Sequence, residues 1–167
     1  MTSPAGREPQ RSPIDPEPRI LPLAASRAAS VRAVVDPLVR RHAAAHVGVH
    51  VSLDAGEGHV FDADPVAVRE LLEPLVAAAF ASAARPVRET DGPCLHEVDV
   101  VVVATADGLE VEIADSGPDE PFAARLPAHI RDVAARCGAE LRMSPCAAGG
   151  TAVTIRFPRR SVRRQAA

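Results

Sequence analysis

The sequence predicts an α/β two-layer sandwich, with helices packed on one face of a mixed, mostly antiparallel sheet. Three stretches show apolar residues at helical spacing, β-branched runs alternate with them, and turn residues separate the segments. The chain has 167 residues, 47% of them apolar, which is enough for one well-buried domain and too short for two ordinary ones. Elements in this order pack as a layer of helices against a sheet.

The first predicted helix covers residues 28–46, where Pro37 either kinks one helix or starts a second. Residues 47–53 then alternate as a strand, and a glycine-containing turn leads to a short strand around Val60. These two strands are predicted to form a hairpin.

The second predicted helix, over residues 65–83, carries the clearest signals in the chain. Asp64 suits the N-cap and Pro65 the first helical position, and an apolar stripe follows. Pro74 lies inside this stripe and costs about 3 kcal/mol unless the helix bends there. We therefore expect an irregular middle in this helix.

Two β-branched runs at residues 98–103 and 109–113 predict central strands. Asp107 and Gly108, which lie between them, suit the positive backbone angles of a tight hairpin turn. The two runs should therefore pair with each other.

The last part of the chain predicts one helix and two strands. A helical stripe begins near Leu126, and Gly138 is placed to end that helix. Residues 141–143 and 152–157 then have strand character, with a loop between them.

Composition marks the ends of the predicted domain, which spans residues 27–158. Residues 1–26 are rich in proline and predict a disordered leader. Residues 159–167 form a basic tail with four arginines, which is typical of a solubilising end. A tail of this kind also leaves nucleic-acid binding open as an alternative.

The missing residue types exclude several functions. The chain has no lysine, asparagine, tryptophan or tyrosine. A lysine-containing phosphate loop and a lysine Schiff base are therefore excluded. Four phenylalanines are too few for a surface that stacks nucleic-acid bases, which makes a nucleic-acid partner unlikely.

The charge and cysteine content predict a soluble, cytoplasmic protein. The net charge is −3, and no apolar run approaches the roughly 18 residues of a membrane span, so no membrane partner is expected. The three cysteines are irregularly spaced and no signal-peptide pattern is present, which argues against secretion.

Four segments occur in a characteristic order: Val47–Val51, Asp64–Ser82, Ile113–Pro118 and Ala134–Phe157. Their order and spacing resemble those of the catalytic ATP-binding domain of sensor histidine kinases, within the GHKL superfamily of ATPases. The resemblance covers about residues 31–158. It implies the two-layer fold predicted above and a nucleotide site at one end of the sheet.

The resemblance implies a nucleotide-binding role for four residues. Asp115 matches the aspartate that accepts a hydrogen bond from the adenine amine, and Gly117 matches a glycine that lets the backbone approach the nucleotide. Gly150 and Thr151 match the end of a later Gly-x-Gly-Thr element. ATP is thereby implied as a ligand at its adenine end.

Other positions depart from the family pattern around the phosphates. Ala78 stands where the family has its magnesium-binding asparagine, and Asp119 and Ala148 replace glycines. The family's mobile lid is reduced to a handful of residues, with residues 124–127 in place of its glycine-rich turn. Magnesium is therefore not expected, unless Glu70 or Glu73 turns from solvent toward the site.

The prediction is a degenerate kinase-like protein of bacterial signal transduction that stands alone, without sensor or acceptor domain. It binds ATP weakly or not at all, has no catalytic residue, and docks a signalling partner such as a kinase, a response regulator or a sigma or anti-sigma factor. A homodimer is left open. The main alternative is a genuine ATP-dependent kinase, of the two-component or anti-sigma serine kinase type, that phosphorylates an acceptor on another chain.

Histidine and cysteine residues offer weaker candidates. His42 and His46 are spaced to share a helix face, where two imidazoles can bind a metal, but solvated helix histidines are the preferred interpretation. Cys94 with His96, or Cys137 with Cys146, lacks the spacing of a zinc site.

Overall fold

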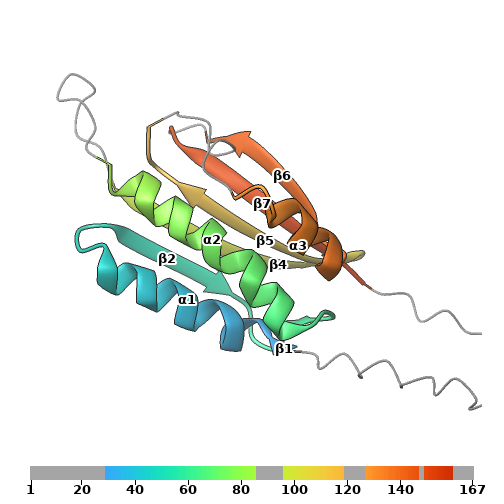
Figure 1. The fold of residues 1–167 in the computed structure, drawn as a ribbon. Helices are drawn as coiled ribbons and strands as arrows, with labels where there is room; N and C mark the ends of the chain where they lie inside the picture. Colours follow the sequence, from blue (N-terminus) through green and yellow to red (C-terminus); the bar gives the residue numbers. More distant parts are fainter. Residues whose placement is uncertain (1–28, 86–95, 119–126, 147–148, 160–167) are drawn as a thin grey trace, which may run out of the picture.

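The computed structural model describes residues 29–85, 96–118, 127–146 and 149–159. Three helices cover one face of a five-stranded sheet (Figure 1). The elements in chain order are β1 (Ala29–Ser30), α1 (Val31–Ala45), β2 (His50–Ala55), β3 (Val60–Phe61), α2 (Pro65–Ala83), β4 (Glu97–Thr105), β5 (Gly108–Asp115), α3 (Ile130–Cys137), β6 (Glu140–Pro145) and β7 (Thr151–Pro158). The predicted fold class is confirmed.

The sheet is mixed and mostly antiparallel, as the sequence predicted. Its strand order is β2-β4-β5-β7-β6, in which only β2 and β4 run parallel. β1 and β3 form a separate two-stranded sheet. The parallel β2–β4 pair requires a crossover connection, and α2 supplies it across the sheet (Figure 1).

The predicted hairpin between residues 47–53 and Val60 is wrong. β2 pairs with β4, and β3 pairs with β1 instead of β2. Alternation of apolar and polar residues predicts a strand but does not specify which strand it pairs with. The short Val60–Phe61 strand is also too short for alternation to determine its partner.

The first two helices follow the predicted pattern. α1 is a single helix that continues through Pro37. Asp64 caps α2, because its Oδ1 accepts a hydrogen bond from the Val66 amide at 3.1 Å. α2 also continues through Pro74 as one helix.

The central hairpin forms as predicted, although its turn lies one residue earlier. Thr105 pairs with Gly108, so Ala106 and Asp107 make the turn and Gly108 begins β5. No described residue other than glycine has a positive φ, so Asp107 does not adopt the backbone expected of it.

The C-terminal helix ends as predicted and begins later. Gly138 has a φ of 68° and ends α3 in the left-handed conformation. α3 begins at Ile130, and Leu126 lies outside the described residues. The same is true of residues 1–28 and 160–167, which include the predicted leader and all of the predicted tail except Arg159.

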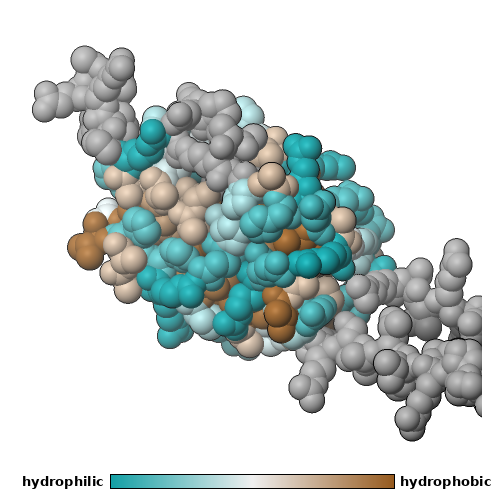
Figure 2. All heavy atoms as spheres, viewed as in Figure 1, coloured by the Kyte–Doolittle hydropathy of each residue, from teal (hydrophilic) through white to brown (hydrophobic). Residues whose placement is uncertain are grey.

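One continuous core lies between the helices and the sheet. The largest fully buried side chains come from both layers: Phe61, Phe80, Leu71, Leu72, Leu75, Ile113, Ile130 and Ile155, with several valines. The helix-covered face itself is largely hydrophilic, with hydrophobic side chains in separate patches (Figure 2). Within the described ranges, no helix combines the length and the apolar character that crossing a membrane requires.

Candidate functional site

Asp115 occupies the end of β5 and is 4% exposed. Its Oδ1 accepts a hydrogen bond from the Gly117 amide at 2.8 Å, which holds the turn after the strand. Its Oδ2 is buried and has no hydrogen-bond partner among the residues that the structure describes. Because a buried carboxylate oxygen is costly without a donor, this atom points to a ligand that supplies one.

Gly117 brings the turn after β5 against the end of α2. A Cβ at Gly117 would lie 2.3 Å from Ser82 Oγ and 2.6 Å from the Ser82 carbonyl oxygen. Ser82 is itself 4% exposed. The absence of a side chain at Gly117 therefore allows β5 and α2 to meet at this end of the sheet.

Gly150 packs against the same strand end from the other side. Its φ is +85°, and a Cβ there would lie 1.8 Å from the carbonyl oxygen of Asp115. Ala152 pairs with Ala114, which places Thr151, the first residue of β7, beside the end of β5. The structure thus brings Asp115, Gly117, Gly150 and Thr151 together.

Cys146 and Ser82 also belong to this region, although the sequence did not assign them to it. The Cys146 amide donates to the Gly150 carbonyl at 3.1 Å. Burial, followed by the charges of Asp115, Glu112 and Asp99, raises the pKa of the Cys146 thiol. No sequence signal separates these two residues from an ordinary loop cysteine and an ordinary helix serine.

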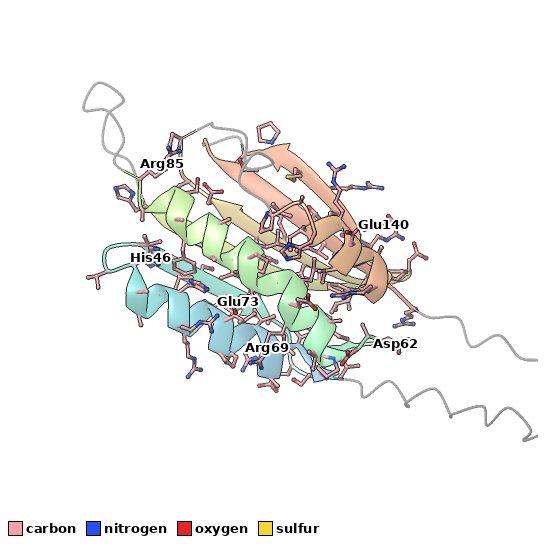
Figure 3. All side chains as sticks on the ribbon, viewed as in Figure 1. His46, Asp62, Arg69, Glu73, Arg85 and Glu140 are labelled. Atoms are coloured by element: carbon pink, nitrogen blue, oxygen red, sulfur yellow. The ribbon has the colours of Figure 1, made fainter. Side chains whose placement is uncertain are left out.

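The other predicted ligands lie along α2 and pair with neighbouring helices. Glu70 forms an exposed ion pair with Arg136 of α3, in which Oε2 and Nη2 are 2.6 Å apart. Glu73 lies on the side of α2 that faces α1 (Figure 3), where it accepts from His42 Nε2 at 3.1 Å and pairs with Arg41. The expectation that Glu73 faces solvent is wrong, because α1 provides partners for it.

The described residues do not fit a magnesium site. Ala78 is half-buried in α2 and supplies no ligand atom. Among the residues that the structure describes, no group of three or more histidine, cysteine, aspartate or glutamate side chains is placed to hold a metal ion. Asp119, Ala148 and Cys94, together with residues 124–126, lie outside the described ranges.

The two helix histidines pack between α1 and α2. The rings of His42 and His46 lie 5.9 and 5.6 Å from the ring of Phe80, measured between centroids. Burial above all, then Arg41 and His46, lowers the pKa of His42. The interpretation of these residues as solvated is therefore wrong, since Phe80 of α2 packs against His42 of α1 and against His46, which directly follows α1.

The chain is similar in structure to several solved ATP-binding domains, although its sequence matches no known family. No protein-family model matches the sequence, and no curated protein matches it either. The ATP-binding domain of PrrB from Mycobacterium tuberculosis matches in structure with a TM-score of 0.62 at 19% identity, over 80% of this chain and 97% of that one. The mycobacterial sensor histidine kinase MprB matches with a TM-score of 0.59 at 18% identity, over 80% and 97% of the two chains.

A third match extends the similarity to another organism. The histidine kinase domain of the E. coli osmosensor EnvZ gives a TM-score of 0.59 at 13% identity, over 86% of this chain and 94% of that one. At these identities the similarity establishes the fold. The chain has the fold of the ATP-binding catalytic domain of histidine kinases.

Proposed function

We propose that this protein is a kinase-like signalling module that keeps the adenine end of a nucleotide site and lacks the phosphate end. It holds adenine nucleotides weakly and acts in the cytoplasm by docking a signalling protein, such as a kinase, a response regulator or a sigma or anti-sigma factor. One observation carries the proposal: the Asp115 carboxylate has a buried oxygen to which no described residue donates, whereas Glu70 and Glu73 of α2 already have partners.

Three features support binding of an adenine base. Asp115 Oδ2 is an acceptor whose position is fixed by the bond from the Gly117 amide to Oδ1. An amine such as that of adenine donates the hydrogen bond that this oxygen lacks. Gly117 and Gly150 let α2 and the loop before β7 pack closely against the end of β5, which holds the Asp115 carboxylate in place.

The described residues give no comparable support for binding a triphosphate. Phosphates need cations or backbone amides, and magnesium needs oxygen ligands. Glu70 and Glu73 are occupied by Arg136, Arg41 and His42, and releasing either carboxylate would break these pairs. Phosphoryl transfer is therefore absent from the proposed function. Binding at the adenine end serves to sense adenine nucleotides or to stabilise the protein.

Calorimetric titration with adenosine, ADP and ATP, each with and without magnesium, tests the proposal. We expect weak binding of all three ligands, with little difference between them and little effect of magnesium. Asp115→Asn should abolish binding of all three ligands, because the amide NH2 in place of Oδ2 is a donor that would face the donor of the adenine amine. Asp99→Asn, which makes the same change at an exposed position of β4, should bind as the unmodified protein does.

Two results would contradict the proposal in different ways. ATP with magnesium that binds at least about tenfold more tightly than adenosine, a gain of about 1.4 kcal/mol, would mean that the phosphate end works and would favour a genuine kinase. No heat with any ligand would mean that the adenine end is also lost, and only the partner-docking part would stand.

A further inference from the structure

β6 forms one edge of the five-stranded sheet. It pairs with β7 on one side, and within the described parts of the chain no strand pairs with its other side. Figure 1 shows β6 as the outermost strand next to α3. An edge of this kind exposes backbone N–H and C=O groups that can pair with another extended chain.

The β6–β7 ladder shows which residues of β6 present those groups. The Cys146 amide donates to the Gly150 carbonyl at 3.1 Å, so these two residues form a hydrogen-bonded position. Such positions alternate along an antiparallel ladder, so the backbone groups of Leu141, Met143 and Pro145 point away from β7. Pro145, which has no N–H, fits such a position.

An apolar groove of about 600 Å³ accompanies the edge on the helix-covered side of the sheet. It lies between α3 and β6, and its lining includes Ile130, Ala134, Ala139, Leu141 and Met143. Met143 is 39% exposed. The edge therefore offers an apolar surface beside its open backbone groups.

The opposite face of β6 carries one charge of each sign. Glu140 and Arg142 are exposed on either side of Leu141, and neither forms an ion pair with a described residue. Glu140 lies at the start of β6, close to α3 (Figure 3). The segment Glu140–Leu141–Arg142 is thus complementary to itself when two copies run antiparallel.

We propose that β6 pairs with β6 of a second copy of this chain, antiparallel, with Leu141 opposite Leu141. In this register each Glu140 lies opposite Arg142 of the other copy, which gives two symmetric ion pairs around the central leucines. Opposite charges at facing positions stabilise a sheet, and like charges destabilise it. A two-fold axis through the Leu141 pair makes the interface closed, as expected of a dimer.

The charges select this register over its neighbours. Only residues with outward backbone groups can form the new hydrogen-bonded pairs, so Leu141 must face Ala139, Leu141, Met143 or Pro145. Leu141 opposite Ala139 would place the two Glu140 side chains opposite each other. Leu141 opposite Met143 would place the two Arg142 side chains opposite each other. Leu141 opposite Pro145 would form a pair that lacks one of its two hydrogen bonds, because Pro145 has no N–H to donate.

The same register also uses the groove. Met143 of the second copy lies opposite Ala139, on the helix-covered side, where the groove is lined by apolar side chains. The Ala139 amide already donates to the Ala134 carbonyl at 2.8 Å, but its own carbonyl is available to the Met143 amide of the second copy. Backbone pairing, ion pairing and apolar packing therefore agree on one arrangement.

The other edge of the sheet is less open. There, Arg32 Nε donates to the Ala55 carbonyl of β2 at 3.2 Å. The β6 edge is also separated from Asp115 by β7, so the dimer does not depend on nucleotide binding. Failure of the proposed nucleotide site would leave this inference untouched.

Analytical ultracentrifugation of the full chain over a series of concentrations tests the dimer. We expect a monomer–dimer equilibrium that Glu140→Arg and Arg142→Glu each weaken by about tenfold or more, because both symmetric pairs become repulsive. An equimolar mixture of the two variants should dimerise again, since every facing pair is then of opposite sign. The double variant Glu140→Arg/Arg142→Glu should also dimerise.

Arg69→Glu provides the matched control, because it makes the same charge change at an exposed position of α2 far from β6 (Figure 3). It should dimerise as the unmodified chain does. Unfolding curves of the single variants check that they are folded, and recovery in the mixture could not come from misfolded chains. A chain that remains monomeric, a dimer unaffected by the reversals, or a mixture that does not recover would each overturn the proposal.

Discussion

The end of α2 and its middle are built in different ways. At the end, Ser82 meets the turn at Gly117 so closely that no side chain fits between them, and one oxygen of Asp115 has no partner in the described part of the chain. In the middle, Glu70 and Glu73 pair with α3 and α1. The end of α2 is thus defined by close packing beside a carboxylate oxygen to which no described residue donates. The middle of α2 is joined to the neighbouring helices by ion pairs.

This difference separates positions that the fold requires from positions that it leaves free to vary. Close backbone packing at the sheet end is needed for the helix and the strands to meet at all, so it contributes to the fold. Polar positions along an exposed helix face are not needed for packing, and ion pairs with neighbouring helices can replace ligand contacts there at little cost in stability. The predictions below test this contrast in order of expected effect.

Gly150→Ala should have the largest effect on stability. The new Cβ would meet the Asp115 carbonyl and would also require a positive φ, so we expect a loss of about 3 kcal/mol in the free energy of unfolding. Gly149→Ala is the matched control, because its φ is +91° but no atom of the described residues lies within 4 Å of a Cβ there. It should cost about 1–2 kcal/mol. Equal losses in urea unfolding would show that close packing at Gly150 is unimportant.

Gly117→Ala should follow, with a loss of about 1–3 kcal/mol from overpacking against Ser82. The same change should also weaken adenosine binding in calorimetry, because the turn that holds Asp115 would move. Urea unfolding measures the first effect. A variant with unchanged stability would mean that α2 and the turn can separate freely, and the contrast between the two regions would lose its basis.

The packing of His42 between α1 and α2 predicts a modest loss of stability in mild acid. Burial chiefly, then Arg41 and His46, holds the pKa of His42 below its ordinary 6.5. The unfolded chain therefore takes up this proton first, so stability is complete above the ordinary pKa and falls as the pH passes through the lowered one. Urea midpoints measured across this range should decrease toward acid, with a smaller slope in His42→Gln. A midpoint that rises on acidification would refute the assignment.

Arg136→Gln should have the smallest effect. It removes the partner of Glu70, but both side chains are about half exposed, at 59% and 48%, and pairs of this kind contribute at most about 1 kcal/mol. Differential scanning calorimetry with and without added salt measures it. If magnesium bound to this variant and not to the unmodified chain, Glu70 would be a ligand held in reserve by Arg136.

Local signals predicted the elements whose ends are set by single residues. Asp64 caps α2 and Gly138 ends α3 because a side-chain acceptor and a left-handed backbone act within one helical turn. The meeting of Asp115 with Gly150 was also anticipated, but from the resemblance to a family and not from spacing. No periodicity in the sequence relates two residues 35 positions apart.

The errors involve partners that are distant in sequence. β2 was expected to pair with the strand at Val60 because that segment follows directly, yet it pairs with β4 after α2 has crossed the sheet. His42 and Glu73 were expected to face solvent. They face each other because α1 and α2 pack side by side.

The sequence by itself determined most of the helices and strands, the caps and the absence of any asparagine or lysine, because these depend on residue identity and on interactions within a few positions. Only the tertiary structure decided which oxygen of Asp115 and which edge of the sheet have no partner among the described residues, and which helix face holds Glu73. These depend on how the layers pack, and packing joins residues whose distance along the chain carries no information about their distance in space.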